Sequence, residues 1–292
     1  MLEITHGAAR AVIAPEGAGL KSYEVGGVPY VETYDADEPP MGSGAVLVPW
    51  PNRVAGGRWV LDGEEQQLEI GEPARGNAIH GLVRRAIWGT VEHTGSLISL
   101  ETPVAGLGWP VELRTTITYA LDENGLSVSH GVTNVGDKRT PFGVGTHPYP
   151  RAGASLTDET SLSLSASTVL PVDAHTMIPS GPALPVEGTD YDFRVARLLE
   201  DVRLDTAFGG CEPVDGLVRH VLKGPGGGVE VWADPDFRWV QVYTPDDFPG
   251  RGRAVAIEPM TCPPDALNSG VDLLWLEPGE SWAGRWGLRP LS

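Results

Sequence analysis

The 292-residue sequence predicts an all-β, mostly antiparallel fold with at most short helices. The chain contains 38 glycines and 26 prolines, a content typical of frequent turns and unfavourable for long helices. Several short segments also alternate apolar and polar residues with the period of two that a half-buried strand requires. Many short strands separated by frequent turns favour a sandwich or a barrel.

The clearest pair of strands spans residues 111–133. Segment 111–121 places apolar side chains mainly at odd positions and polar side chains at even positions. Asp122-Glu123-Asn124-Gly125 follows, a sequence that favours a turn, and apolar and polar residues alternate again over 126–133. This pattern predicts a β-hairpin.

Shorter runs predict further strands, and little of the chain has helical periodicity. The strand-like segments are 96–102, 161–168, 229–233, 239–244 and 253–258. A short helix is predicted over 191–200 with Asp190 as its N-cap, and one helical turn over 264–268. Segment 171–188 is rich in proline and glycine and predicts a long surface connection. We find no repeat or low-complexity tract, so we predict a single domain over residues 1–292.

Charge and cysteine content restrict the class of protein. Lysine and arginine number 21 against 39 acidic residues, and a net charge of −18 disfavours binding to nucleic acid or anionic membranes. No apolar run has the length of a signal peptide or membrane span. Cys211 and Cys262 are too few for a disulfide framework. We expect two reduced thiols in a cytoplasmic protein, and the alternative is a single disulfide bridge between them.

Polar residues with a distinctive local context lie in four segments. These are Pro49–Arg53 with Gly56 and Gly57 after it, Asn77–Gly81, Gly143–Tyr149 and Ala254–Thr261. By strand parity, Glu258 shares a face with two alanines, 254 and 256, and His147 shares a face with two glycines, 143 and 145. Small neighbours beside a large polar side chain suggest room for a ligand.

Taken singly, each of these residues has a more common structural interpretation. A lone histidine or glutamate in a β protein is usually a satisfied core or surface residue, and Arg53 beside glycines is usually a turn residue. His80, His147 and Glu258 are also suitable types for a two-histidine, one-carboxylate metal site, but no HxH, HxxxH or CxxC pair is present. A nucleophilic role for Cys262 needs an imidazole partner that the sequence does not place.

Together, six segments resemble the aldose 1-epimerase family and follow one another in the family's order. They are PWPNRVAGGRW (49–59), NAIHGLVRRAIW (77–88), GTHPY (145–149), LDTAF (204–208), VQVYTP (240–245) and IEPMTCPPDALN (257–268). The resemblance covers roughly residues 12 to 288. It implies a galactose-mutarotase-like β-supersandwich with the sugar in an open cleft, and it implies neither metal nor cofactor.

The resemblance also implies which residues act. His147 would be the general acid and Glu258 the general base of an aldose 1-epimerase, or mutarotase, that interconverts the α and β anomers of a free aldose. Both groups are expected to work near their ordinary pKa values, about 6.5 and 4.3. Either Tyr243 or Trp50 would face the C–H surface of the sugar. The implied substrate-binding residues are Arg53, His80, Asp205, Asn52 and Tyr243.

Other functions stay open at this point. Pro148-Tyr149-Pro150 follows the histidine where many family members have Tyr-Phe-Asn-Leu, which leaves the substrate undetermined. An epimerase of a phosphorylated or sulfonated sugar would need extra cations, for which Arg75, Arg84 and Arg85 are candidates. The further alternatives are a non-catalytic sugar-binding protein and a metal-dependent isomerase. The expected partner is a small sugar, and the protein is expected to be a monomer or a homodimer.

Overall fold

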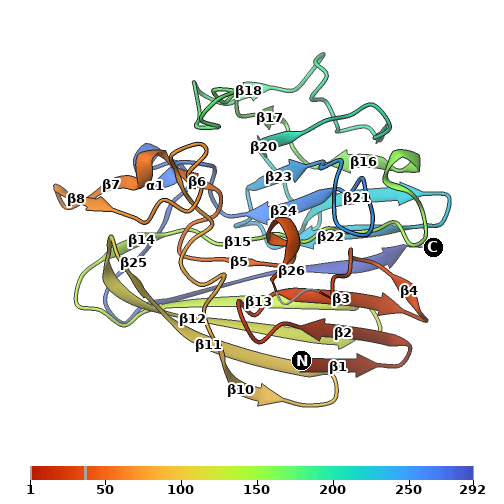
Figure 1. Cartoon of the computed structure of the whole chain (residues 1–292), viewed down its shortest axis with the longest axis horizontal. Coiled ribbons are helices and arrows are strands. Elements are labelled where there is room, and N and C mark those ends of the chain that lie inside the picture. Colours follow the sequence, from red (N-terminus) through yellow and green to blue (C-terminus); the bar gives the residue numbers. More distant parts are fainter. Residues whose placement is uncertain (1, 36–37, 292) are drawn as a thin grey trace.

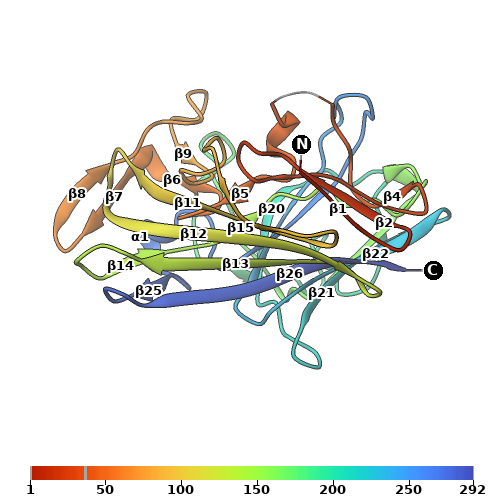
Figure 2. The ribbon, with the colours of Figure 1, turned by 90° about the horizontal axis from the view of Figure 1, so that it is seen from below.

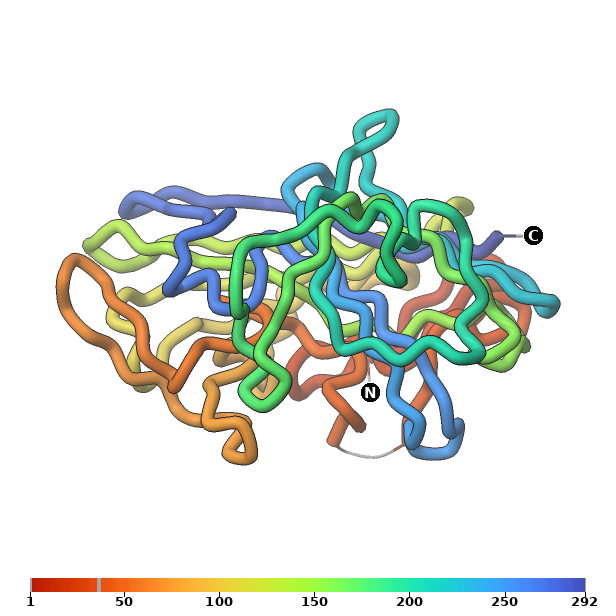
Figure 3. Tube along the Cα trace, turned by 90° about the horizontal axis from the view of Figure 1, so that it is seen from above, coloured from red at the N-terminus to blue at the C-terminus, as the bar shows by residue number. Residues whose placement is uncertain are grey.

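The computed structural model describes residues 2–35 and 38–291, which form layered antiparallel β-sheets (Figure 1). Figure 2 shows β12, β13 and β26 running side by side as long strands along one side of the molecule. The β17–β18 region lies at the top of Figure 1, and Figure 3 views the chain from that side. The predicted all-β, antiparallel class with at most short helices is confirmed.

Nine strands of the described residues form the larger sheet, in the spatial order β10-β11-β12-β13-β26-β22-β21-β16-β19. The predicted hairpin is β12 paired with β13, from Leu113 opposite Asn134 to Asp122 opposite Gly125. The strands are β10 (Gly89–His93), β11 (Leu97–Gly106), β12 (Trp109–Asp122), β13 (Gly125–Asn134), β16 (Ser161–Leu164), β19 (Arg197–Leu198), β21 (Val218–Gly224), β22 (Gly227–Ala233) and β26 (Ser281–Leu291).

A second sheet of seven strands has the order β18-β17-β20-β23-β24-β15-β5 within the described residues. Its three neighbouring strands β20, β23 and β24 pair antiparallel along their lengths. The strands are β5 (Val46–Leu47), β15 (Gly145–Thr146), β17 (Thr168–Val169), β18 (Leu184–Pro185), β20 (Asp205–Gly209), β23 (Trp239–Tyr243) and β24 (Ala256–Met260).

Shorter elements complete the described structure. A four-stranded sheet holds β1 (Leu2–His6), β2 (Ala9–Ile13), β3 (Leu20–Val25) and β4 (Val28–Pro29). Three two-stranded ladders pair β14 (Thr140–Phe142) with β25 (Leu274–Leu276), β6 (Arg53–Val54) with β9 (Ala78–Ile79), and β7 (Arg58–Leu61) with β8 (Glu64–Gln67). The helical elements are η1 (Pro40–Gly42), η2 (Ala55–Gly57), η3 (Thr157–Glu159) and α1 (Ala266–Ser269).

The core follows from the alternation seen in the sequence. In β12 the odd-numbered side chains from Trp109 to Leu121 are buried, while the even-numbered ones are exposed or partly exposed. Each fully buried large apolar side chain stabilises the fold by about 1.5–3 kcal/mol. The indole rings of Trp59 and Trp109 stack with centroids 4.9 Å apart, so β7 is held against the same core. This packing gives the site a rigid support.

Three local expectations need correction. The predicted helix over 191–200 is wrong, because Arg197 and Leu198 pair with Leu162 and Ser161 at a sheet edge. The predicted strand 161–168 is interrupted between β16 and β17. The strand predicted from residue 253 begins only at Ala256. The helical turn predicted near 264–268 is confirmed as α1. No helix of the described residues has the length and apolarity needed to cross a membrane.

Candidate active site

Three neighbouring strands of the seven-stranded sheet place polar side chains on one face. Asp205 on β20 lies opposite Tyr243 on β23, and Gln241 on β23 lies opposite Glu258 on β24. Because side chains alternate between the faces of a strand, these four share one face. The Gln241 amide Nε2 donates to Asp205 Oδ1 at 2.6 Å, which fixes both side chains. The sheet therefore presents a rigid polar row with Glu258 at its end.

His147 meets that row from the next strand. It follows β15, which pairs with β24 through Gly145 opposite Met260, and its backbone N–H donates to Ala45. The imidazole Nε2 lies 3.4 Å from Glu258 Oε1, and both side chains are buried. The catalytic pair implied by the family resemblance is thus in direct contact in the structure.

Aromatic packing and a glycine fix the orientation of the His147 ring. Tyr149 stacks on it with centroids 5.2 Å apart and planes 23° apart, and the Tyr149 hydroxyl donates to the Met41 carbonyl. A β-carbon at Gly42 would lie 3.2 Å from His147 Cδ2, so the backbone of this glycine approaches the ring closely. Gly42 has a φ of +74°, which glycine adopts at little cost.

A second group of polar residues comes from the β6–β9 ladder. Asn52 and His80 both adopt left-handed backbone conformations, with φ of 54° and 63°. The Asn52 side-chain oxygen accepts a hydrogen bond from the Arg53 backbone N–H. The Asn52 backbone carbonyl accepts one from the His80 backbone N–H. Asparagine tolerates this conformation better than most residues, which explains its place there. The ring of His80 meets that of His147 edge-on, with centroids 5.4 Å apart.

Glu72 orients the Arg53 guanidinium and was not predicted from the sequence. Its two carboxylate oxygens accept from Arg53 Nε at 2.8 Å and from Nη2 at 3.0 Å, a bidentate geometry. Arg53 Nη2 also lies 3.6 Å from Asp205, and Arg75 lies 3.3 Å from Glu72. No local motif marks Glu72, because its partner is 19 residues away in the chain.

These side chains line one cavity of about 290 Å³. All seven residues expected at the site contribute to this cavity. The alternative aromatic residue, Trp50, does not line it. The Trp50 side chain is buried in the core beside Trp109, so it cannot face a sugar. Met41, Glu72 and Gln241 were not predicted as site residues from the sequence, and Arg75 was predicted only as a candidate cation. The full lining is Met41, Asn52, Arg53, Glu72, Arg75, His80, His147, Asp205, Gln241, Tyr243 and Glu258.

Several buried polar atoms around this cavity find no hydrogen-bond partner among the described residues. They are Nδ1 of His80, Nδ1 of His147, Oε1 of Gln241 and Oε2 of Glu258. Buried polar atoms are almost always paired, and leaving one unpaired costs about 1–3 kcal/mol. Such a concentration around one cavity is typical of a site that hydrogen-bonds a polar ligand.

Burial shifts the protonation of the pair away from the expected ordinary values. It lowers the pKa of His147 to about 4, because the imidazolium loses its hydration. Burial also raises the pKa of Glu258 well above its usual range, and the charge of Asp205 adds to this while Arg53 opposes it. Burial lowers the pKa of His80 as well, and the nearby cations add to that effect. The expectation of nearly unperturbed groups was therefore wrong.

The glycines beside His147 have a different purpose from the one expected. A β-carbon at Gly143 would lie 2.4 Å from Cys262 Sγ, and one at Gly145 would lie 2.7 Å from Pro51 Cβ. These glycines let the strand pack closely against its neighbours, so they leave no room for a ligand. The inference of open space from their small size was wrong.

Other chemistries find less support in the geometry. No group of three or more His, Cys, Asp or Glu in the described part of the chain is arranged to hold a metal ion. Cys211 and Cys262 are free and buried, and burial raises the pKa of each thiol to about 12. A thiol with so high a pKa is a poor nucleophile.

Fold and site define an all-β protein with a polar pocket built around a buried histidine–glutamate pair, an arrangement typical of acid–base enzymes. Comparison with known proteins gives the family. The aldose 1-epimerase family model matches residues 1–289. The uncharacterized protein YihR of Escherichia coli K12 is 34% identical over 275 residues, covering 92% of this chain and 86% of YihR. The chain therefore belongs to the aldose 1-epimerase family, whose enzymes are isomerases.

More distant relatives agree with this assignment. Human galactose mutarotase is 33% identical over 174 residues, covering 56% of this chain and about half, 49%, of that protein. The crystal structure of a putative aldose 1-epimerase from E. coli K12 superposes with a TM-score of 0.84 at 23% identity, covering 99% of this chain and 98% of the other. An aldose epimerase homologue from C. elegans gives 0.85 at 18% identity, covering 100% and 99%. These likenesses confirm the galactose-mutarotase-like β-supersandwich.

Proposed function

We propose that this protein is an aldose 1-epimerase that interconverts the α and β anomers of a free aldose by acid–base ring opening and closure. His147 would protonate the ring oxygen and Glu258 would take the proton of the C1 hydroxyl. The open aldehyde then rotates about C1–C2 and closes on its other face, with the two groups exchanging roles. A positioned acid or base typically contributes about 10²–10⁴ in rate.

The observation that carries this proposal is the direct contact of a buried acid–base pair within a polar cavity, 3.4 Å between His147 and Glu258. Together the two groups carry one proton, which can be donated, and one basic lone pair, which can accept another proton. Oε2 of Glu258 is buried and has no partner among the described residues, so the proposed base keeps one unpaired acceptor. A protein that only bound sugars would gain nothing from burying these two groups together.

Recognition of the sugar would fall to the surrounding side chains. Arg53, held by Glu72, presents donors in fixed directions, while Asp205 and Asn52 offer acceptors. His80 faces His147 across the cavity wall. Tyr243, about half-buried, gives an aromatic face for the C–H surface of the ring. A cavity of about 290 Å³ lies at the small end of the range for ligand sites, which suits a single sugar ring.

Polarimetry of freshly dissolved α-D-glucose and α-D-galactose tests the proposal. We expect the wild type to accelerate the approach to anomeric equilibrium, and Glu258→Gln and His147→Asn to lose at least about 99% of that rate while keeping wild-type circular dichroism. Wild-type activity in Glu258→Gln would refute the assigned base. No acceleration of any aldose would leave the sugar-binding alternative.

The proposal also includes the cellular location and the oligomeric state of the protein. We place the enzyme in the cytoplasm because both cysteines are free and buried, as in a reducing compartment. We expect a monomer or a homodimer that needs no partner beyond its sugar substrate.

A further inference from the structure

Arg75 lines the sugar pocket, although the family resemblance assigns it no role there. Its side chain is 33% exposed. It lies in the turn 72–77, in which the Glu72 N–H donates to the Asn77 carbonyl at 3.0 Å and the Gly76 N–H donates to the Glu72 carbonyl at 2.9 Å. These bonds close the turn on itself, so the backbone that carries this arginine is fixed before a sugar binds.

The Arg75 guanidinium is held by groups on two chain segments. Its Nε lies 3.3 Å from Oε1 of Glu72, the carboxylate that also holds Arg53. Its Nη1 donates to the His175 carbonyl at 2.8 Å and to the Ala174 carbonyl at 3.5 Å. Its Nη2 makes no hydrogen bond with the residues that the structure describes. The guanidinium is therefore oriented through two of its nitrogens, and the N–H groups of the third stay available to a ligand.

The carbonyls that hold Nη1 belong to segment 171–188, which was predicted as a long surface connection. Asp173 braces the turn at its start, where Oδ1 accepts from the Thr176 backbone N–H at 2.8 Å and from the Thr176 hydroxyl at 2.9 Å. The Asn77 side-chain amide donates to the Thr176 carbonyl at 2.7 Å, which joins the two turns. Two turns about 100 residues apart in the chain thus fix one arginine at the pocket.

Neither of the other two arginines considered as extra cations lines this pocket in the described structure. Arg85 is exposed and pairs with Glu38 at 2.5 Å. Arg84 lines a different cavity and interacts with the charges of Glu38 and Glu69. Arg75 is therefore the one of the three that is placed to contact the sugar.

Contacts within the pocket separate Arg75 from the acid–base pair. Arg53 pairs with Asp205 on one side and with Glu72 on the other, and Glu72 in turn pairs with Arg75. Burial raises the pKa of Glu258, Asp205 adds to this and Arg53 opposes it, whereas Arg75 is not among the causes. A group with so little influence on the catalytic carboxyl can contribute to binding the sugar without changing proton transfer.

We infer that Arg75 is a specificity-determining residue, whose Nη2 donates a hydrogen bond to a hydroxyl of the sugar other than the one on C1. This inference rests on the proposed function, and it adds a second arginine to the recognition of the sugar. Hydroxyl oxygens accept such a bond through their lone pairs. A hydrogen bond from a charged donor typically changes affinity by about tenfold or more. Because the Arg75 side chain is partly exposed, we expect the low end of this range.

Anomer-exchange NMR at equilibrium tests this with glucose and its 2-deoxy, 3-deoxy, 4-deoxy and 6-deoxy derivatives. For glucose, we expect Arg75→Gln to raise KM by about tenfold and to leave kcat within about twofold. For the derivative that lacks the bonded hydroxyl, the same substitution should change kcat/KM by less than about twofold. Each of the other derivatives should lose about tenfold in kcat/KM, as glucose does.

Two control variants separate a sugar contact from a structural role. Asp173→Ala loosens the turn that holds Nη1 but keeps the guanidinium of Arg75, so any change in kcat/KM should be the same for all of these sugars. Arg58→Gln removes a positive charge from an exposed side chain on β7 and should change kcat/KM for none of them.

Two results would overturn the inference while leaving the proposed function intact. In one, Arg75→Gln lowers kcat/KM equally for glucose and every deoxy derivative, as expected of an arginine that only joins the two turns. In the other, Arg75→Gln leaves KM for glucose unchanged. Absence of acceleration of any sugar by the wild type would instead refute the proposed function, and the inference with it.

Discussion

In the proposed reaction, the proton shared by His147 and Glu258 decides which group acts as acid and which as base. The pKa of the imidazole is lowered to about 4 and that of the carboxyl is raised, both by burial. Over the range between these values the pair holds one proton, so one group can donate while the other accepts. Because the two groups are 3.4 Å apart, their titrations belong to the pair. These shifts place the shared proton on Glu258 in the free enzyme, so the proposed roles require that proton to pass to His147 before the ring opens.

At the same scale, motif residues were easier to predict than their supports. Arg53, His80 and Asp205 were assigned from segments that resemble the family, and the structure brings all three to the cavity. Gln241 and Glu72 reach the same cavity through strand register and a distant ion pair, neither of which local sequence encodes. The pKa shifts were also missed, because burial depends on the packing of the whole sheet.

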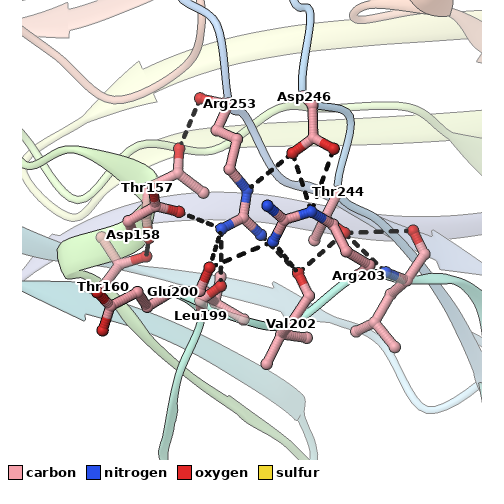
Figure 4. A network of polar contacts seen from close by, with 11 residues as sticks. Thr157, Asp158, Thr160, Leu199, Glu200, Val202, Arg203, Thr244, Asp246 and Arg253 are labelled. Atoms are coloured by element: carbon pink, nitrogen blue, oxygen red, sulfur yellow. Dashed lines mark hydrogen bonds and ion pairs between the residues drawn. The ribbon is translucent and has the colours of Figure 1, made fainter.

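At the scale of elements, one arginine joins the two chain segments that lead into the site (Figure 4). Arg253 precedes β24, which holds Glu258, and its guanidinium donates to the backbone carbonyls of Leu199, Glu200 and Val202. Those residues precede β20, which begins with Asp205. The Arg253 side chain also pairs with Asp158, and the backbone carbonyl of Arg253 accepts a hydrogen bond from the Thr157 hydroxyl. Arg253 thus fixes the approach to two site residues at once.

We predict that Arg253→Gln lowers the free energy of unfolding by about 1–3 kcal/mol, because three backbone carbonyls, two of them in partly buried contacts, lose a charged donor. Arg203→Gln is a matched control, since Arg203 and Arg253 both pair with Asp246 and both donate to the Glu200 and Val202 carbonyls, but the Arg203 side chain is 50% exposed. An exposed ion pair contributes at most about 1 kcal/mol. Urea unfolding measures both variants. Equal stability of the two would contradict the central place of Arg253.

The types of most elements were predictable, and their ends were not. The alternation over 111–133 predicted the long hairpin because one face of these strands is buried and the other meets solvent. The strand expected from residue 253 starts three residues later, because Arg253 turns toward the carbonyls of another segment. The helix expected over 191–200 gives way to an edge pairing with β16. In each case a tertiary contact overrode the local pattern.

At the scale of the whole molecule, buried histidines make the fold sensitive to acid. Burial lowers the pKa of both His130 and His220 to about 3. Each is protonated near pH 6.5 in the unfolded chain but only near pH 3 in the folded one. Their stabilising contribution is therefore complete above pH 6.5 and is lost progressively as the pH falls toward 3. Over most of that interval, each of the two histidines lowers the free energy of unfolding by about 1.4 kcal/mol for every pH unit of acidification.

Other buried groups change the size of this pH dependence of the free energy of unfolding, but they do not reverse its sign. His80 and His147 act in the same direction, while burial raises the pKa of Glu32 and Glu258, which favours the folded state on acidification. We predict a net loss on the order of 1–3 kcal/mol in unfolding free energy between pH 7 and 6. Urea titrations at several pH values measure it, and His220→Asn should reduce the slope. A stability independent of pH would contradict the burial of these histidines as neutral groups.

Overall architecture was within reach of the sequence because its strand pattern and its family resemblance agree, and the structural neighbours confirm the supersandwich. Sheet order and the convergence of segments 52–80, 147, 205–243 and 258 on one pocket follow from long-range pairing, which periodicity alone does not define. The description of residues 1–292 as one domain stays a prediction.

The proposed His147–Glu258 pair is tested most directly by the pH dependence of kcat/KM for anomer exchange, measured from pH 3.5 to 9 with the buffer-catalysed rate subtracted. Below about pH 4 the pair holds two protons and has no base, so activity falls. It falls again only above the raised pKa of Glu258, well beyond the ordinary carboxyl range. We therefore predict a broad plateau of kcat/KM that extends upward from near pH 4. A narrow optimum between about 4.5 and 6.5, as two unperturbed groups would give, would contradict it.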